Sequence, residues 1–148
     1  MRTQRILVVD DERAFAEILF EMLREEGYSV ERAYDGRQAL ALVAANGPPD
    51  LVLCDVMLPK LNGAALTSEL RRRFPTLPLP VVLMSASADP RLREPNVHFL
   101  AKPLDFLELL GLIEMLLGDA SRTLAAETQL RSRRATNPAS ASATLHTS

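Results

Sequence analysis

The stretch LVLCDVMLP, residues 51–59, places an acidic side chain inside an apolar run. The residues from Leu51 to Cys54 are typical of a strand that is buried on both faces of a sheet. Asp55 follows them directly, before more apolar residues and Pro59. Because an ionised carboxylate among apolar neighbours is unfavourable without a compensating group, the position predicts a functional role for Asp55.

On both sides of this stretch, short apolar runs alternate with segments of helical periodicity. The pattern predicts strands at 6–9, 29–34, 51–54, 79–84 and 97–101. It predicts helices around 15–23 and at 35–47, 62–75 and 103–118. We therefore expect an α/β fold, a doubly wound, five-stranded parallel sheet with helices on both faces.

Composition restricts the classes of partner and compartment. The 148 residues carry a net charge of −2. So small a charge does not attract nucleic acid or an anionic membrane strongly, and neither is expected as the main partner. No apolar run approaches the roughly 18 residues of a membrane span, and the start does not resemble a secretory signal. With a single cysteine, the chain is expected to be cytoplasmic, without membrane insertion.

The composition changes after Gly118. Residues 119–148 are rich in Arg, Ser, Ala and Thr, a pattern that predicts a polar and largely disordered tail. We expect residues 1–118 to form the domain. The tail is too short for an independent effector domain, so direct DNA binding is not expected.

Polar side chains follow four of the predicted strands. They are Asp10 and Asp11 after the first strand, Asp55 after the third, Ser85 after the fourth and Lys102 after the fifth. In an open parallel sheet, ligands bind at the carboxyl ends of the strands. A single polar residue after a strand is ordinary, because loops are polar. Polar residues after four strands, brought to the same edge of the sheet, indicate a binding site.

The chemistry of such a site follows from its residue types. Three neighbouring carboxylates repel one another unless a cation lies among them, and oxygen ligands on loops suit Mg²⁺. Lys102 and the Ser85 hydroxyl can each contact a phosphoryl oxygen. Asp55 can then act as a nucleophile toward phosphorus and form an aspartyl phosphate.

Four motifs carry a resemblance to a known family: ILVVDDE, LVLCDVMLPKLNG, VVLMSA and FLAKP. Over residues 5–118 the chain resembles the receiver domain of bacterial two-component response regulators, of the stand-alone type. The resemblance implies a flavodoxin-like sheet of strand order 2-1-3-4-5. It also implies that a sensor histidine kinase or a phosphotransfer protein phosphorylates Asp55, and that the chain catalyses only its own phosphorylation and dephosphorylation.

The resemblance also implies a metal site and a control on phosphate loss. Asp11, Asp55 and the backbone carbonyl of Met57 would bind Mg²⁺ directly, while Asp10 would assist through water. Met57 and Ser87, two residues past the nucleophile and past the switch hydroxyl, would influence access of the hydrolytic water.

Further residues match the family's switch. Ser85 would be the switch hydroxyl, Lys102 the phosphate-sensing lysine and Phe99 the switch aromatic. The Lys102–Pro103 bond would be cis.

The segment between the switch hydroxyl and the lysine departs from the family pattern, because it is short and contains Pro90 and Pro95. Proline interrupts a helix, so the fourth helix is predicted to be shortened or missing.

The last predicted helix has a second apolar face. Its residues are Leu104, Leu107, Leu112 and Met115. This stripe either packs under residues 86–96 or the tail, or forms an interface for a homodimer or another partner.

Three other functions share parts of this pattern. A pseudo-receiver, which is an interaction module that does not use phosphorylation, remains the alternative. A flavodoxin-like carrier of FMN needs a phosphate-binding loop after the first strand, where this chain has DDER. A haloacid-dehalogenase-like phosphatase needs a second aspartate where Met57 stands.

Overall fold

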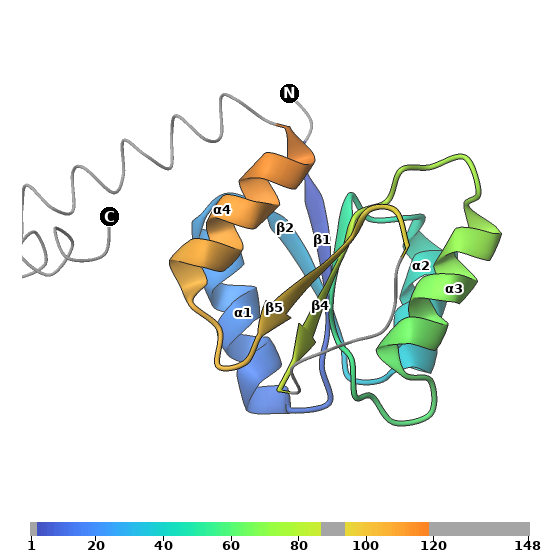
Figure 1. Cartoon of the computed structure of the whole chain (residues 1–148), viewed down its shortest axis with the longest axis horizontal. Helices are drawn as coiled ribbons and strands as arrows, with labels where there is room; N and C mark the ends of the chain where they lie inside the picture. The colour runs from blue at the N-terminus through green and yellow to red at the C-terminus, as the bar shows by residue number, and fades with distance from the viewer. Residues whose placement is uncertain (1–2, 87–93, 119–148) are drawn as a thin grey trace, which may run out of the picture. The chain divides into compact units, whose positions relative to one another are not determined.

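The computed structural model describes residues 3–86 and 94–118. The chain divides into two units, Met1–Leu109 and Leu110–Ser148. The sheet and the first three helices belong to the first unit (Figure 1). The predicted tail, residues 119–148, lies outside the described residues, as do residues 87–93.

Five parallel strands form one sheet in the order β2-β1-β3-β4-β5, which confirms the predicted fold class. The strands are β1 Arg5–Val9, β2 Ser29–Ala33, β3 Leu51–Asp55, β4 Val81–Ser85 and β5 Val97–Ala101. The three central strands have almost entirely buried side chains, as expected for a parallel sheet covered on both faces. The polar β2, with one buried residue, lies at an edge.

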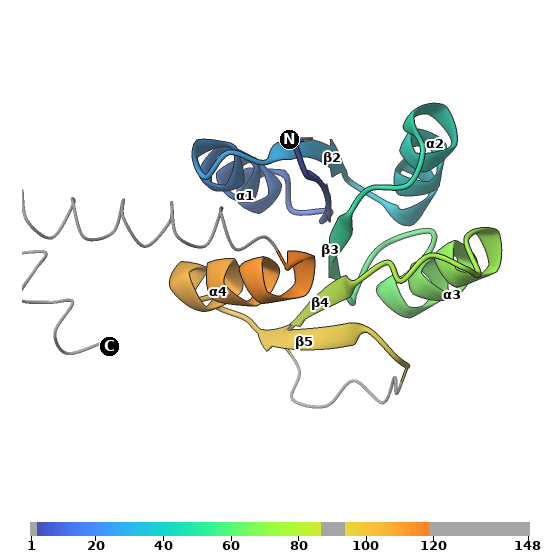
Figure 2. The ribbon, with the colours of Figure 1, turned by 90° about the horizontal axis from the view of Figure 1, so that it is seen from above.

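The described residues contain four helices: α1 Arg13–Glu25, α2 Gly36–Asn46, α3 Gly63–Arg73 and α4 Phe106–Leu117. Figure 2 shows α1 on one side of the sheet and α2 with α3 on the other. Asp35 and Asn62 cap α2 and α3 by accepting the N–H groups of Gln38 and Ala65. None of the helices in the described part combines the length and the apolar content that crossing a bilayer requires.

The core on the α2 and α3 side is built from alternate strand residues. Leu7 and Val9 of β1 and Val52 and Cys54 of β3 belong to one buried cluster. Leu66 and Leu70 of α3 and Val43 of α2 belong to the same cluster. The intervening residues, including Val8 and Leu53, are also fully buried, so both faces of the sheet are covered. The strand ends that carry the acidic residues are thus fixed by a rigid support.

Two elements begin later than the sequence pattern indicates. Strand β4 starts at Val81, because Pro80 lacks an N–H group and only its carbonyl pairs, accepting from Val52. Helix α4 starts at Phe106, because the Asp105 carboxylate accepts the N–H groups of residues 107 and 108 and so caps the helix.

No helix lies between β4 and β5 among the described residues, and most of the segment where a shortened helix could form is not described. The residues that lead into β5 are held by Arg71 of α3. Its guanidinium donates to the carbonyls of Leu79, Pro95 and Asn96. Asn96 in turn donates to the Pro78 carbonyl. This end of the connection is therefore fixed to α3 and β4.

The loop after β3 is fastened to the start of α2. Lys60, which has a positive φ of 68°, places its Nζ 3.4 Å from the Asp35 carboxylate. Leu61 approaches Gly36 so closely that a Cβ on this glycine would lie 2.4 Å from the Leu61 carbonyl oxygen. Only glycine fits this contact, and the ion pair and the contact together fix the loop that follows Asp55.

The close packing of Gly63, the first residue of α3, against the end of β3 can be tested by mutation. A Cβ there would lie 2.7 Å from the backbone oxygen of Asp55 and 3.0 Å from the Cα of Val56. Gly63→Ala should therefore lower the free energy of unfolding in urea by about 1–3 kcal/mol. Gly111→Ala is the matched control, since no atom lies within 4 Å of its added Cβ and it should be neutral or stabilising by up to about 1 kcal/mol. Equal stability of the two variants would contradict the close packing at Gly63.

Candidate functional site

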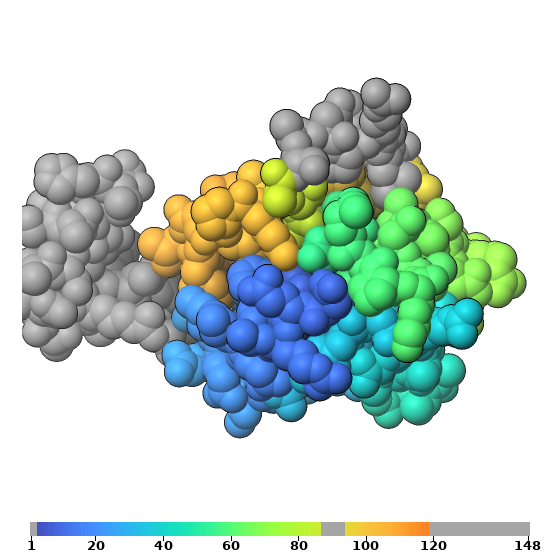
Figure 3. Space-filling view, turned by 90° about the horizontal axis from the view of Figure 1, so that it is seen from below, coloured from blue at the N-terminus to red at the C-terminus, as the bar shows by residue number. Residues whose placement is uncertain are grey.

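Three carboxylates converge at the carboxyl ends of β1 and β3. One carboxylate oxygen from each of Asp10, Asp11 and Asp55 lies within 4.8 Å of the other two. Figure 3 looks onto this edge of the sheet, where the blue segment after β1 adjoins the green segment after β3. Because the register pairs Val9 with Cys54, the residues that follow them are brought to the same place.

Lys102, which follows β5, joins this acidic cluster. Its Nζ donates to Asp10 Oδ2 at 3.0 Å and to Asp55 Oδ2 at 3.1 Å. The backbone N–H of Lys102 donates to the carbonyl of Ser85, at the end of β4. The lysine thus connects the ends of three strands, and its one positive charge lies among three carboxylates.

Burial and charge act in opposite directions on these groups. Asp10 is 0% exposed, and its desolvation raises the pKa despite hydrogen bonds from the Glu12 N–H and from Lys102. Desolvation alone would lower the pKa of Lys102, but the two carboxylates outweigh it and the pKa is raised. The cluster therefore holds more negative charge than the lysine balances.

The donor set fits a hard divalent cation. All three side chains offer carboxylate oxygens on a strand end or loop, the ligand type that Mg²⁺ takes in proteins. Asp11 is exposed and Asp55 is partly exposed, so the cluster opens to solvent and can retain the waters that Mg²⁺ releases reluctantly.

The other residues predicted for the site take different positions around it. The Met57 N–H donates to Asp55 Oδ1 at 3.0 Å, while the Met57 side chain is 75% exposed. Ser85 is buried at the end of β4, and Phe99 is half-buried on β5 against the core cluster. The peptide bond between Lys102 and Pro103 is cis.

The remaining predicted residues are Ser87 and the apolar stripe of the last helix. Ser87 falls outside the described residues. The apolar stripe of the last helix lies on α4 and just before it; Leu107 is 49% and Met115 67% exposed, and Leu104 and Leu112 are half-buried.

One contact at the site was not predicted from the sequence. The Lys102 Nζ lies 4.7 Å from the centroid of the Phe15 ring, which belongs to the first turn of α1. The helical periodicity marks Phe15 only as an apolar residue, so no sequence signal pointed to it.

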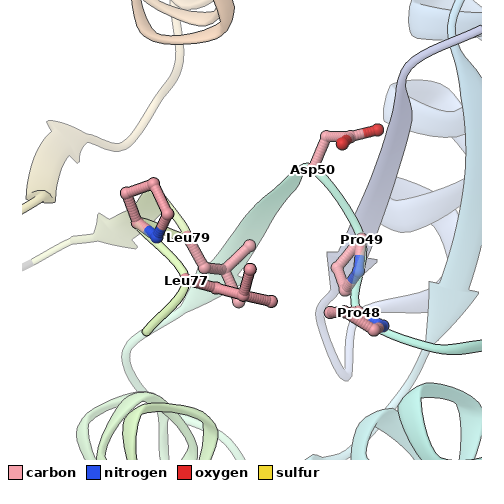
Figure 4. A pocket seen from close by; sticks show the side chains of 6 residues that line it. Pro48, Pro49, Asp50, Leu77 and Leu79 are labelled. Carbon is pink, nitrogen blue, oxygen red and sulfur yellow. The ribbon is translucent and has the colours of Figure 1, made fainter. Parts of the chain in front are cut away.

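A pocket of about 330 Å³ lies at the opposite ends of β3 and β4 (Figure 4). It is lined by Pro48, Pro49, Asp50, Leu77, Pro78 and Leu79. Asp50 is its one charged residue, and the Asp50 carboxylate accepts the backbone N–H of Arg5 at 2.7 Å. With no further reactive group in its lining, this pocket is a weaker candidate than the acidic cluster.

The family model for the response regulator receiver domain matches residues 6–114. The chain belongs to this family. The match includes every residue of the acidic cluster and Lys102, and it ends within α4.

Curated relatives carry the same family name. The response regulator MprA of Mycolicibacterium vanbaalenii is 42% identical over 116 residues, which are 76% of this chain and 50% of the relative. MprA of Mycobacterium avium is 41% identical over the same shares. The chain thus spans about half the length of these curated relatives.

Solved structures of receiver domains have the same fold. The receiver domain of the hybrid histidine kinase CckA is 35% identical, with a TM-score of 0.66, and the match covers 76% of this chain and 98% of that one. The receiver domain of the Francisella response regulator 1452 is 28% identical, with a TM-score of 0.70 and coverage of 78% and 98%.

Proposed function

We propose that this receiver domain is a phosphoacceptor that takes a phosphoryl group on Asp55. The observation that carries the proposal is the convergence of three carboxylates within 4.8 Å, with Lys102 bound to two of them. A phosphoryl-transfer site needs positioning and charge neutralisation more than acid–base groups, and this cluster offers both.

The transfer itself requires Asp55 as the nucleophile. One carboxylate oxygen of Asp55 forms a bond to phosphorus while the bond between phosphorus and the donor's nitrogen breaks, and the nitrogen keeps the electron pair. We take the donor to be the phosphohistidine of a sensor histidine kinase or of a phosphotransfer protein. The Met57 N–H and Lys102 orient the two oxygens of Asp55 for this step.

Mg²⁺ is the proposed cofactor. Asp11, Asp55 and the Met57 carbonyl would hold it directly, and Asp10 through a water molecule. When bound, Mg²⁺ supplies the positive charge that offsets the transferred phosphoryl oxygens and the three carboxylates. Three carboxylates face the single ammonium of Lys102 in the described part of the site, so a further cation would be favourable there.

Lys102 and Ser85 would contact the phosphoryl oxygens after transfer. The Lys102 ammonium is a point charge already located beside Asp55, and Ser85 lies next to it through the bond to its carbonyl. Phe99, in the middle of β5 and three residues before Lys102, is the proposed aromatic switch. The signal would then pass by protein contact or by relay of the phosphoryl group.

The apolar stripe of the last helix is the proposed contact surface. Leu107 and Met115 are among the few large apolar side chains exposed in the described part of the chain. Exposed apolar residues grouped on one helix mark interaction sites. We propose that a second copy or another partner binds through Leu104, Leu107, Leu112 and Met115.

Asp55→Asn should abolish phosphorylation. Incubation of the wild type with acetyl phosphate and Mg²⁺ should add the mass of one phosphoryl group, and mass spectrometry should find none on the variant. Asp50→Asn, an aspartate at the opposite edge of the sheet, is the matched control and should react like the wild type. Chelation of the metal should also stop the reaction, because the carboxylates need its charge.

Two outcomes would count against this assignment. Phosphorylation of Asp55→Asn at the wild-type rate would place the phosphoryl group elsewhere. A wild type that takes no phosphoryl group would favour the alternative, an interaction module that does not use phosphorylation.

Met57→Asn should speed the loss of phosphate from Asp55. The exposed methionine offers no hydrogen bond to orient a hydrolytic water, whereas an asparagine amide does. One added hydrogen bond of ordinary strength corresponds to about a fivefold increase in rate. Decay of the phosphorylated mass gives the rate, with Leu77→Asn, an exposed apolar residue at the opposite edge, as the control. Unchanged or slower decay in Met57→Asn would refute this role.

Leu107→Glu combined with Met115→Glu should disperse a homodimer and leave phosphorylation of Asp55 intact. Two charges in an apolar interface would be buried without partners, which is unfavourable. Light scattering with and without acetyl phosphate gives the mass, and Ile18→Glu, an exposed apolar position on α1, is the control. A wild type that is monomeric in both conditions would exclude self-association through this surface.

A further inference from the structure

Phe15 lies against the charged end of Lys102. The Lys102 Nζ is 4.7 Å from the centroid of the Phe15 ring, inside the range of about 6 Å over which an aromatic face attracts a cation. The same nitrogen is 3.0 Å from Asp10 Oδ2 and 3.1 Å from Asp55 Oδ2. The ammonium group is therefore held by two carboxylates and one ring.

We infer that Phe15 is a positioning residue of the phosphorylation site, whose ring keeps the Lys102 ammonium in place beside Asp55. The inference rests on the proposed function of Asp55. Phe15 acts through the lysine: its ring contacts the Lys102 ammonium, which in turn donates to Asp55 Oδ2.

A lysine in this position needs support of this kind. Its four-carbon stem is flexible, and the ammonium is a point charge without the fixed fork of an arginine. The two carboxylates that now hold it are also the groups that a metal and a phosphoryl group would engage. Asp55 in particular loses a free oxygen when it is phosphorylated. The attraction of the Phe15 ring does not depend on those oxygens, so it can act on the ammonium when they bind other groups.

The arrangement also distinguishes Phe15 from a residue that only fills the core. Phe15 is half-buried, and its ring faces the nitrogen at the end of the lysine. Phe20, on the same helix and also half-buried, instead lies under the guanidinium of Arg32 at 3.7 Å. The two phenylalanines thus provide a matched pair, one that contacts the site lysine and one that contacts an arginine of β2.

The test measures the affinity of the full chain for beryllofluoride, a phosphoryl mimic, in the presence of Mg²⁺. Phe15→Leu should weaken this affinity by about two- to thirtyfold, the range of one cation–ring contact. Phe15→Tyr, which keeps the aromatic face, should bind within about twofold of the wild type. Phe20→Leu should bind like the wild type. A small probe is used so that contacts with a protein phosphodonor do not contribute to the measured affinity.

Two further measurements show whether a loss of beryllofluoride affinity comes from the contact between Phe15 and Lys102. The affinity for Mg²⁺ alone should be the same in all variants, because Phe15 acts on the lysine and not on the carboxylates. In proton NMR spectra, the ε-protons of Lys102 should show a ring-current shift in the wild type and in Phe15→Tyr, and should lose it in Phe15→Leu. If Phe15→Leu does not fold by circular dichroism, Phe15→Met, with a linear apolar side chain, replaces it.

The inference is overturned if the ring-free variant binds beryllofluoride as tightly as the wild type, or if Phe15→Tyr is weakened as much as Phe15→Leu. It is also overturned if the Lys102 ε-protons show no ring-current shift in the wild type. Failure of the proposed function is a separate result: the wild type would then bind no beryllofluoride, while the NMR comparison, made without it, would still report on the contact.

Discussion

Repulsion among three carboxylates is the constraint around which this structure is organised. At separations near 4 Å and an effective dielectric constant near 20, two like charges repel by about 4 kcal/mol. Asp10, Asp11 and Asp55 lie within such distances because the sheet order brings the ends of β1 and β3 together. The Lys102 ammonium offsets part of this repulsion, and a divalent cation would offset more. The repulsion would fall when a cation binds, which accords with the proposed role of the site in phosphoryl transfer.

The fold tolerates this repulsion because its support is rigid. The strands that end in acidic residues have side chains buried on both faces, and close-packed interiors do not deform gradually. Gly63 adds to this by allowing the start of α3 to contact the backbone of Asp55. The backbone positions of the acidic residues therefore cannot move apart without disturbing the core, and the fully buried Asp10 side chain cannot turn away from the site.

Much of this arrangement could be predicted from the sequence, and the exceptions have physical causes. Apolar runs located β1, β3, β4 and β5, and a more polar, alternating run located β2. The polar residues at the strand ends indicated the site, since the carboxyl ends of parallel strands share one edge of the sheet. The predicted starts of β4 and α4 were two and three residues too early, because Pro80 and the capping carboxylate of Asp105 determine where these elements begin. Contacts between side chains distant in the chain could not be predicted. The Phe15 ring beneath Lys102 and the Arg71 guanidinium on the Pro95 and Asn96 carbonyls depend on packing that periodicity does not contain.

Asp35 uses its two carboxylate oxygens for different purposes. Oδ1 caps α2 by accepting the Gln38 N–H at 2.7 Å, and Oδ2 pairs with Lys60 in the loop that follows Asp55. The stability of α2 and the placement of the loop that carries Met57 thus depend on one side chain. A substitution at position 35 would remove the helix cap and the ion pair with Lys60 at the same time. The evolution of the scaffold and that of the site are therefore coupled at this residue.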